Sequence, residues 1–292
     1  MILDFHVHIF PPEIRQRRDE YCGKDRHFQA LYASGKAKLA TAEDLVRAMD
    51  TAGVDAAVAL NFGWGSHELC VETNNYILDA AVQHAGRLIP FCVVQPKAGD
   101  MARREIERCA LAGARGIGEL MPDAQGFDLG DRETMRPLAE AAQENGLLVL
   151  SHASEPVGHS YPGKGRTTPD VLMRFVQNFP DLAIVFAHLG GGLPFYALMR
   201  EVREALRNVY FDTAAQPFLY HPSVYRHTAD IVGVDKILFG SDYPLLGFQR
   251  YVKQITALEL TDHDKQSILG GNGLRLIAQA KGLGSAARPR TA

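Results

Sequence analysis

The chain opens with Met1-Ile-Leu-Asp-Phe-His-Val-His-Ile9, in which polar and apolar side chains alternate. Residues two apart on a β-strand point to the same face, so we expect His6 and His8 to project together, with Phe5 and Val7 on the opposite face. Seven further short apolar runs follow, and each of the eight precedes a segment with helical periodicity. The predicted strands are Ile2–His8, Asp55–Leu60, Leu88–Val93, Gly116–Leu120, Leu147–His152, Ala183–His188, Val209–Asp212 and Lys236–Ser241. Eight βα units predict an α/β fold, a closed (β/α)8 TIM barrel.

Two segments exceed this repeat. Residues 11–40 form an insertion between the first strand and its helix, and they could either cap the mouth of the barrel or run over its surface. Residues 262–269 and 272–281 have the pattern of additional C-terminal helices. We expect residues 1–282 to form one domain and residues 283–292 to form a flexible tail.

Composition limits the classes of partner. Of the 292 residues, 46% are hydrophobic and 22% are charged, which is ordinary for a folded globular protein. The net charge of −3, without a long basic run, gives no reason to expect nucleic acid. No apolar run approaches the roughly 20 residues of a membrane helix, and the four cysteines are scattered without a disulfide pattern. We therefore expect a cytoplasmic protein that acts on a small molecule, and a homo-oligomer is compatible with the sequence.

Polar residues recur where the predicted strands end. A (β/α)8 barrel carries its function at the carboxyl ends of its strands, where the loops converge. One histidine there is usually a hydrogen-bonded wall residue, and one aspartate usually caps the next helix. Six such groups at one rim instead predict a site for a divalent metal, and imidazole with carboxylate ligands suits Zn²⁺. The predicted ligands are His6, His8, Glu119, His152, His188 and Asp242.

Four motifs at these strand ends carry a family resemblance. They are Asp4-Phe-His-Val-His8, Ser151-His152, Ala187-His188-Leu-Gly-Gly-Gly192 and Phe239-Gly-Ser-Asp-Tyr-Pro244. Over nearly its whole length the chain resembles the amidohydrolase superfamily, and more closely its aminocarboxymuconate-semialdehyde-decarboxylase-like, amidohydrolase-related branch. The resemblance implies a divalent metal, usually zinc, bound by His6, His8, His152 and Asp242, with His188 as an active-site histidine.

The resemblance leaves the role of Glu119 open. Mononuclear decarboxylase-like members need no acid on the fourth strand, whereas related binuclear hydrolases of the TatD type use a glutamate there to bridge two metals. In the second case His152 and His188 would hold the second ion. The sequence therefore allows one ion or two.

The chemistry expected from this site begins with a water molecule activated by the metal. A bound cation lowers the pKa of water from 15.7 toward about 7. Asp242 would carry the proton to the leaving group, and His188 would polarise the scissile carbonyl. We first expect a metal-dependent hydrolase of a small amide, ester or lactone that carries a carboxylate. The alternatives are a non-oxidative decarboxylase or hydratase of an unsaturated or aromatic acid, a TatD-like nuclease, and a non-catalytic metal-binding barrel.

Two loops are candidates for substrate binding. The loop after the fifth strand is rich in glycine, proline and cations, and it could hold an anionic group, although cations in such loops are usually solvated. The segment after the second strand could form another wall, although packing explains it nearly as well. The candidate residues are Asn61, Trp64, His159, Tyr161, Lys164 and Arg166.

Overall fold

Eight parallel strands form the centre of the protein, and each pairs with the next in the order β1 to β8. The computed structural model describes the backbone of residues 1–286 and the side chains of residues 1–280. The strands are β1 (Leu3–His8), β2 (Ala56–Leu60), β3 (Leu88–Cys92), β4 (Gly116–Leu120), β5 (Leu148–Ser151), β6 (Ile184–Phe186), β7 (Val209–Asp212) and β8 (Ile237–Leu238). Phe5 N donates to Phe239 O at 2.6 Å and His8 N to Tyr243 O at 2.7 Å, which joins β1 to the segment containing β8 and the residues after it. The predicted (β/α)8 barrel is confirmed.

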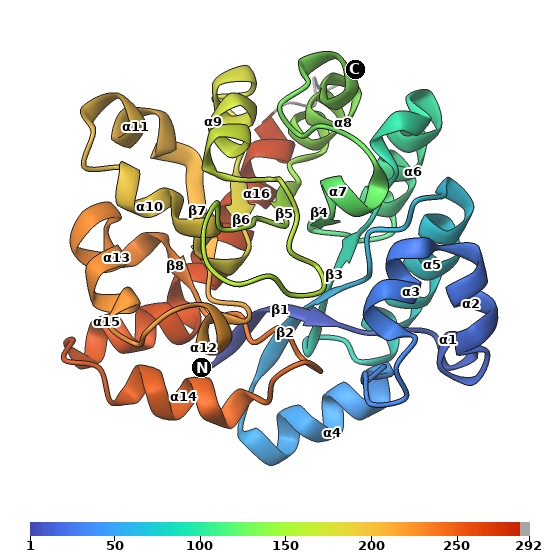
Figure 1. The fold of residues 1–292 in the computed structure, drawn as a ribbon, viewed down its shortest axis with the longest axis horizontal. Helices are drawn as coiled ribbons and strands as arrows, with labels where there is room; N and C mark the ends of the chain where they lie inside the picture. The colour runs from blue at the N-terminus through green and yellow to red at the C-terminus, as the bar shows by residue number, and fades with distance from the viewer. Residues whose placement is uncertain (287–292) are drawn as a thin grey trace.

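Helices surround the strands, as Figure 1 shows. Their ends follow local rules: Thr41 and Asp44 form a reciprocal capping box at the start of α4, which ends at Gly53 in the left-handed region, with φ 70°. The helices before β4 are α1 (Pro12–Gln16), α2 (Arg18–Lys24), α3 (Arg26–Tyr32), α4 (Ala42–Ala52), α5 (His67–Gln83) and α6 (Asp100–Leu111). The later ones are α7 (Pro122–Gln125), α8 (Arg132–Asn145), α9 (Pro169–Asn178), α10 (Leu193–Tyr196), α11 (Arg200–Ala205), α12 (Gln216–Leu219), α13 (Val224–Val232), α14 (Phe248–Thr256), α15 (Asp262–Gln266) and α16 (Asn272–Ala286).

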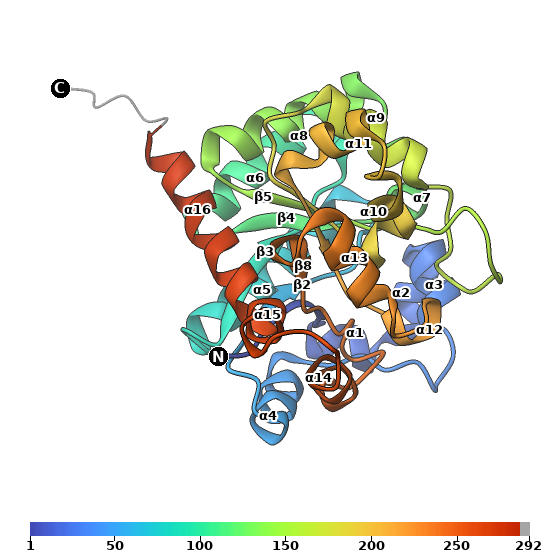
Figure 2. The ribbon, with the colours of Figure 1, turned by 90° about the vertical axis from the view of Figure 1, so that its left-hand side faces the viewer.

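The interior of the barrel is filled by apolar side chains from several strands. Leu3 and Phe5 belong to one buried cluster with residues of β2, β3, β5, β6 and β8, and α16 adds Leu276 and Ile277. Figure 2 shows α16 on the opposite side of the molecule from α3 and α12. Because α16 packs against this interior, the two ends of the barrel differ: α16 covers one end, and the other is left for the loops that follow the strands.

The first strand departs from simple alternation. Its pairing with β2 shifts register between Asp4 and Val7. Phe5 packs in the barrel interior, whereas Val7 packs in the outer cluster. Our prediction that Phe5 shares a face with Val7 is therefore wrong, because the irregularity changes the alternation just before the histidines. His6 and His8 do project together, as their spacing predicts.

The insertion after β1 covers the mouth of the barrel. It contains α1, α2 and α3, and the Asp25 side chain begins α3 by accepting from the backbone N–H groups of His27 and Phe28. The other Asp25 carboxylate oxygen accepts from Gly65 N at 2.9 Å, which ties the insertion to the segment after β2. Phe28 stacks on Trp64 with ring centroids 4.9 Å apart. Of the two roles considered for residues 11–40, these contacts favour a cap.

The C-terminal segment is helical through Ala286. A π-helical turn, Ser267–Gly271, joins α15 to α16. Of the predicted flexible tail, residues 283–286 continue α16, and residues 287–292 lie outside the described residues.

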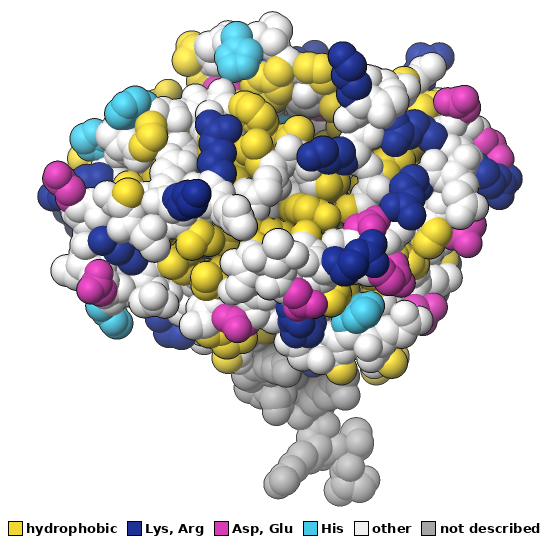
Figure 3. Space-filling model, turned by 90° about the horizontal axis from the view of Figure 1, so that it is seen from below, with side chains coloured by type: hydrophobic (Ala, Val, Ile, Leu, Met, Phe, Trp, Pro, Cys, Tyr) yellow, Lys and Arg dark blue, Asp and Glu magenta, His cyan; other side chains and the backbone are white. Residues whose placement is uncertain are grey.

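Within residues 1–286, no helix combines the length and hydrophobicity that a membrane span requires. On the face seen in Figure 3, lysine and arginine side chains stand apart among hydrophobic and uncharged ones, so this face offers no continuous basic surface.

Candidate metal centre and its cavity

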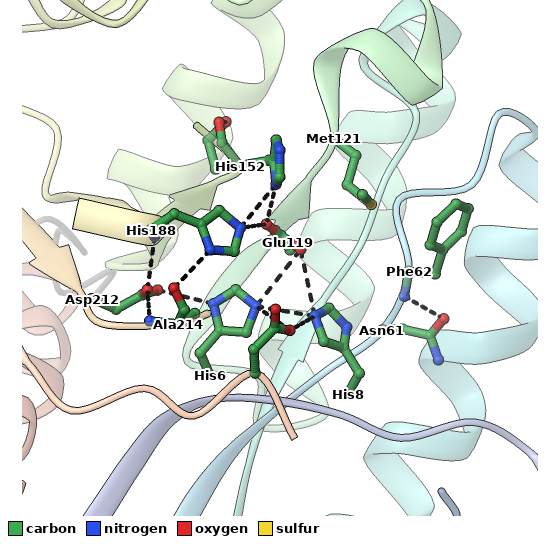
Figure 4. Close-up of polar contacts among 12 residues, drawn as sticks. His6, His8, Asn61, Phe62, Glu119, Met121, His152, His188, Asp212 and Ala214 are labelled. Atoms are coloured by element: carbon green, nitrogen blue, oxygen red, sulfur yellow. Dashed lines mark hydrogen bonds and ion pairs between the residues drawn. The ribbon is translucent and has the colours of Figure 1, made fainter. Parts of the chain in front are cut away.

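Six predicted ligands meet at the carboxyl ends of the strands, as the close-up in Figure 4 shows for five of them by label. We call this set the ligand cluster; it consists of His6, His8, Glu119, His152, His188 and Asp242. His6 is completely buried, and the other imidazoles and Glu119 are at most 9% exposed. The sequence prediction that strand ends far apart in the chain converge on one site therefore agrees with the structure.

The first half of the cluster gathers two imidazoles and two carboxylates. His6 Nε2 lies 3.0 Å from His8 Nε2. Glu119 Oε2 is 3.7 Å from His6 Nε2 and 3.5 Å from His8 Nε2. Asp242 Oδ1 is 3.8 Å and 3.4 Å from the same two nitrogens.

The second half of the cluster uses the other oxygen of Glu119. His152 Nδ1 lies 3.1 Å from Glu119 Oε1 and 3.1 Å from His188 Nε2. His188 Nε2 is 3.7 Å from the same Glu119 oxygen. The structure thus groups His152 with His188 and Glu119, and Glu119 stands between the two halves as a bridging residue would.

Asp212 orients two of the histidines, and our sequence prediction missed it. Its Oδ2 accepts from His6 Nδ1 at 2.9 Å, so that His6 Nε2 faces the cluster. Its Oδ1 accepts from the backbone N–H of His188 at 3.1 Å. His188 Nδ1 donates to the carbonyl of Ala214 at 2.9 Å, which turns His188 Nε2 inward. Asp212 ends the predicted seventh strand, so its place at the rim was a signal that we could have used.

These geometries fit a divalent cation. Bonds of about 2.0–2.1 Å to a tetrahedral zinc place neighbouring ligand atoms roughly 3.3 Å apart. The distances of 3.0–3.8 Å in the first half bracket that spacing. A carboxylate that holds the far nitrogen of a ligating histidine, as Asp212 holds His6, is a frequent companion of metal sites. The imidazole nitrogens and carboxylate oxygens of the cluster lie close together and are largely buried. Burying the negatively charged carboxylates is unfavourable unless a positive charge compensates them.

The electrostatics of the cluster point the same way. Burial is the largest influence on the His6 pKa and lowers it, yet the charges of Asp212 and Glu119 hold that pKa well above its ordinary value. Burial likewise opposes ionisation of Glu119, but the His6 charge and hydrogen bonds from His152 and His188 keep its pKa well below the usual range. The His188 pKa is about 9, because Glu119 outweighs the effect of burial. Negative charge in the cluster therefore favours bound cations, whether protons or a metal.

Two members of the cluster have unusual backbone conformations. His188 has φ 57° and Asp242 has φ 63°, both in the left-handed region that side chains other than glycine seldom adopt. His188 lies in the segment after β6 and Asp242 in the segment after β8, and Asp242 N donates to His6 O at 2.9 Å. Such conformations persist where the surroundings impose them, and they concentrate at functional sites.

A cavity of about 470 Å³ opens onto the cluster. His8, Glu119, His152, His188 and Asp242 lie at its lining. The rest of the lining, which we call the outer wall, is mainly apolar and aromatic, and it includes Leu31, Tyr32, Lys38, Phe62, Tyr161 and Phe218. Pockets of 300–1,000 Å³ with few polar groups are typical of sites for small molecules.

The six predicted substrate-binding residues divide into two groups. His159 and Tyr161 lie at the cavity lining, as expected. Lys164 and Arg166 do not: Lys164 Nζ donates to the carbonyls of Val157 and His159 at 2.7 and 3.1 Å, and the Arg166 side chain is 97% exposed.

Asn61 and Trp64 also lie away from the cavity. Both are fully buried. Asn61 donates to Ile9 O at 2.8 Å, and its oxygen accepts from Phe62 N and from the Trp64 indole at 2.7 and 3.0 Å. These two side chains stabilise the segment after β2, which contributes Phe62 to the outer wall. For Trp64 the structure therefore agrees with a packing role.

Comparisons with known proteins identify the family. The model of the family described as Amidohydrolase matches residues 3–278, so the chain belongs to that family. The chain is 25% identical to 6-methylsalicylic acid decarboxylase of Penicillium expansum, over 96% of this chain and 97% of that protein. It is 22% identical to 2-amino-3-carboxymuconate-6-semialdehyde decarboxylase of Dictyostelium discoideum, over 94% of this chain and 91% of that protein.

A solved structure shares the fold. It is 5-carboxyvanillate decarboxylase of Novosphingobium aromaticivorans, complexed with manganese and 4-hydroxy-3-methoxy-5-nitrobenzoic acid. The TM-score is 0.76 at 20% identity, and the match covers 95% of this chain and 96% of that one. The predicted superfamily and its decarboxylase-like branch are thus confirmed, and the chain is an enzyme of that superfamily.

The predicted reaction needs correction. We expected hydrolysis of an amide, ester or lactone, but both relatives that match along nearly their whole length are named for decarboxylation. The prediction of a hydrolase is therefore wrong, and the alternative that we kept is better supported. The error arose because the same ligand set serves both reactions, so the ligands alone do not reveal which bond is broken.

Proposed function

We propose that this protein is a metal-dependent, non-oxidative decarboxylase of a small aromatic acid. The observation that carries the proposal is a cavity whose outer wall is apolar and aromatic and whose inner end is the ligand cluster. An aromatic ring suits such a wall, and its carboxylate suits a cationic inner end. The reactions for which the two curated relatives are named support the same choice.

The first half of the cluster would hold one divalent ion through His6, His8, Glu119 and Asp242. This half offers four donor groups, and each imidazole nitrogen lies 3.0–3.8 Å from its neighbours, whereas the second half offers three donor groups and shares Glu119 with the first. When bound, the ion would supply Lewis-acid polarisation of the oxygens of the substrate. Imidazole-rich sites suit zinc, and the related decarboxylase of Novosphingobium aromaticivorans contains manganese, so both metals belong in the first assay.

Asp242 would carry the proton of the reaction. Decarboxylation breaks the bond between the ring carbon and the carboxylate, carbon dioxide leaves, and the electron pair stays on the ring carbon until a proton joins it. Burial raises the pKa of Asp242, but the hydrogen bond from His8 and the nearby imidazole charges together outweigh burial, so the pKa lies below its ordinary value. The carboxylate is therefore ionised and can accept a proton. Asp242 would take a proton from a substrate hydroxyl or from solvent and deliver it to the ring carbon.

His188 would hold the departing group in place. Its Nδ1 hydrogen is committed to Ala214 O, so Nε2 is the atom available toward the cavity. An N–H at Nε2 would donate to a carboxylate oxygen of the substrate. The aromatic outer wall would exclude water from the reacting carbon.

The direct test is carbon dioxide release. Protein loaded with zinc or manganese is incubated with 6-methylsalicylate and with 5-carboxyvanillate, while carbon dioxide and the decarboxylated phenol are measured together. We expect equal amounts of both products from at least one acid, none after chelation, and a rate lower by about 10²–10⁴-fold in Asp242→Asn. If the metal-loaded protein releases carbon dioxide from none of these acids, the proposal of an aromatic-acid decarboxylase is contradicted.

A further inference from the structure

Asp4 is a buried carboxylate outside the ligand cluster. It lies on β1, two residues before His6, and its side chain is fully buried. Its Oδ1 accepts from the backbone N–H of His6 at 2.9 Å and from the backbone N–H of Ser241 at 3.1 Å. One oxygen atom thus joins β1 to the segment after β8, at the place where the barrel closes.

Both donors belong to the immediate surroundings of the ligand cluster. His6 is a member of the cluster, and Ser241 comes directly before Asp242. Asp242 N donates to His6 O at 2.9 Å, so two consecutive N–H groups, those of Ser241 and Asp242, are both held by β1. The two segments lie so close that a Cβ on Gly240 would be 2.9 Å from the Cβ of His6.

These bonds restrain the backbone of Asp242 in an unusual conformation. Its φ of 63° lies in the left-handed region, which residues other than glycine seldom keep unless their surroundings impose it. In this conformation Asp242 Oδ1 lies 3.8 Å from His6 Nε2 and 3.4 Å from His8 Nε2. The position of the carboxylate in the cluster therefore depends on how the turn before it is held.

Only one oxygen of Asp4 makes these contacts. Its Oδ2 is buried, and among residues 1–280 it has no hydrogen-bond partner. The two bonds therefore require an acceptor at the place of Oδ1 and do not require a second oxygen. An asparagine side chain has one such acceptor and nearly the same size, whereas alanine has none.

We propose that Asp4 is a positioning residue of the metal centre: by holding the N–H groups of His6 and Ser241 on one oxygen atom, it fixes the Asp242 carboxylate relative to the His6 imidazole. The inference rests on the part of the proposed function that assigns one ion to His6, His8, Glu119 and Asp242, and it does not depend on the reaction. It gives a role to the first residue of the Asp4–His8 motif.

Zinc affinity, measured by competition with a chelator, tests this inference without turnover. Asp4→Ala leaves two buried N–H groups without their acceptor and releases the turn before Asp242, so zinc affinity should fall about 10–100-fold. Asp4→Asn keeps the acceptor and should keep most of the affinity. Native affinity in Asp4→Ala overturns the inference. A tenfold or larger loss in Asp4→Asn also overturns it, even if Asp4→Ala does not fold, because the two bonds alone would then not suffice.

Asn272→Ala is the matched control for a general weakening of β8. Asn272 is 1% exposed and donates two bonds of 2.8 Å to the carbonyls of Val234 and Ile237, at the start of β8. Asp242 lies beyond the other end of that strand. Asn272→Ala should lower the melting temperature, as Asp4→Ala should, but keep the native zinc affinity. An equal loss of zinc affinity in both variants overturns the inference.

The visible spectrum of bound cobalt(II) separates positioning from a uniform loss of affinity, because it depends on the number and arrangement of the ligands. At saturating cobalt, Asp4→Ala should resemble Asp242→Ala, whereas Asp4→Asn and Asn272→Ala should keep the native spectrum. A native spectrum in Asp4→Ala overturns the inference. If the native protein binds neither zinc nor cobalt, the inference and the proposed function fail together, whereas a failure confined to the Asp4 variants leaves the proposed function standing.

Discussion

The ligand cluster and the outer wall of the same cavity are built in different ways. The cluster comes from strands and the residues that follow them, and Asp212 and Ala214 fix the orientation of His6 and His188 by hydrogen bonds. The outer wall comes from the insertion after β1 and from loops, and Phe218 and Lys38 on it are exposed to solvent.

This contrast separates two kinds of effect. A change in the cluster alters groups that share a buried network, so metal affinity and turnover should suffer together. A change in the outer wall alters contacts to the substrate at the edge of solvent, so the KM should change more than the kcat. On the proposed function, the barrel would determine the chemistry, and the insertion and loops would determine which molecule reacts.

The largest effects are expected from His6→Ala and Asp242→Asn, both in the ligand cluster. Because the amide in Asp242→Asn cannot accept and return the proton, the kcat should fall by about 10²–10⁴-fold while the circular dichroism spectrum stays native. His6→Ala should abolish metal-dependent activity, also without unfolding, because the apolar interior of the barrel is separate from the cluster. Asp181→Asn, at an exposed surface ion pair with Arg207, is the control. Global unfolding of either cluster variant would blur the contrast between the regions.

Metal content provides the next test. Elemental analysis of protein purified without chelator should find about one divalent ion per chain, and Glu119→Ala should lower the occupancy because Oε2 faces both His6 and His8. Two ions per chain in the native protein, falling to one or fewer in the variant, would instead mean that Glu119 bridges a pair of ions. That result would contradict the single-ion site proposed above.

A smaller effect is expected from Asp212→Asn. The variant weakens the bond that orients His6, so metal affinity measured by competition with a chelator should fall about 10–100-fold. Asp181→Asn should leave the affinity unchanged. Native affinity in Asp212→Asn would mean that packing alone orients His6.

The smallest effect is expected at the two lysines near the mouth. Lys38→Ala should raise the KM for an aromatic acid about two- to fivefold with little change in the kcat, because an exposed ammonium contributes a screened attraction. The difference should shrink at high salt. Lys164→Ala removes bonds to loop carbonyls instead, so its effect should not depend on salt. If the KM depended on salt in Lys164→Ala but not in Lys38→Ala, Lys164 would be the residue that attracts the anionic substrate, as the sequence suggested.

The fold was predictable because strands and helices have distinct periods. Gly116–Leu120 and Val209–Asp212 have the predicted bounds, and the other strands differ only at their ends. The irregularity in β1 was not predictable, since it depends on pairing with β2 and leaves no mark on the alternation of Met1–Ile9.

The ligands were predictable for a related reason. A barrel brings all its strand ends to one rim, so a polar residue there has a known destination. The outer wall had no such rule. Tyr32 and Lys38 belong to an insertion without a repeat, and the place of Tyr32, the last residue of α3, depends on how α3 packs on Phe62 and Trp64 through Phe28. Asn61 and Trp64 were placed at the wall because nearness in sequence was taken for nearness to substrate.

The tight join between two loops has a consequence for how such an enzyme could diversify. Gly191 has φ 58°, and a Cβ on it would overlap the carbonyl oxygen of Ser154. The glycine turn after β6 is therefore pressed against the start of the loop after β5, which anchors that loop at residue 154, just after His152. Beyond this anchor, residues 156–160 are exposed. Recombination or laboratory grafting could thus replace that stretch as a cassette, giving new substrate ranges while the reaction centre is inherited intact.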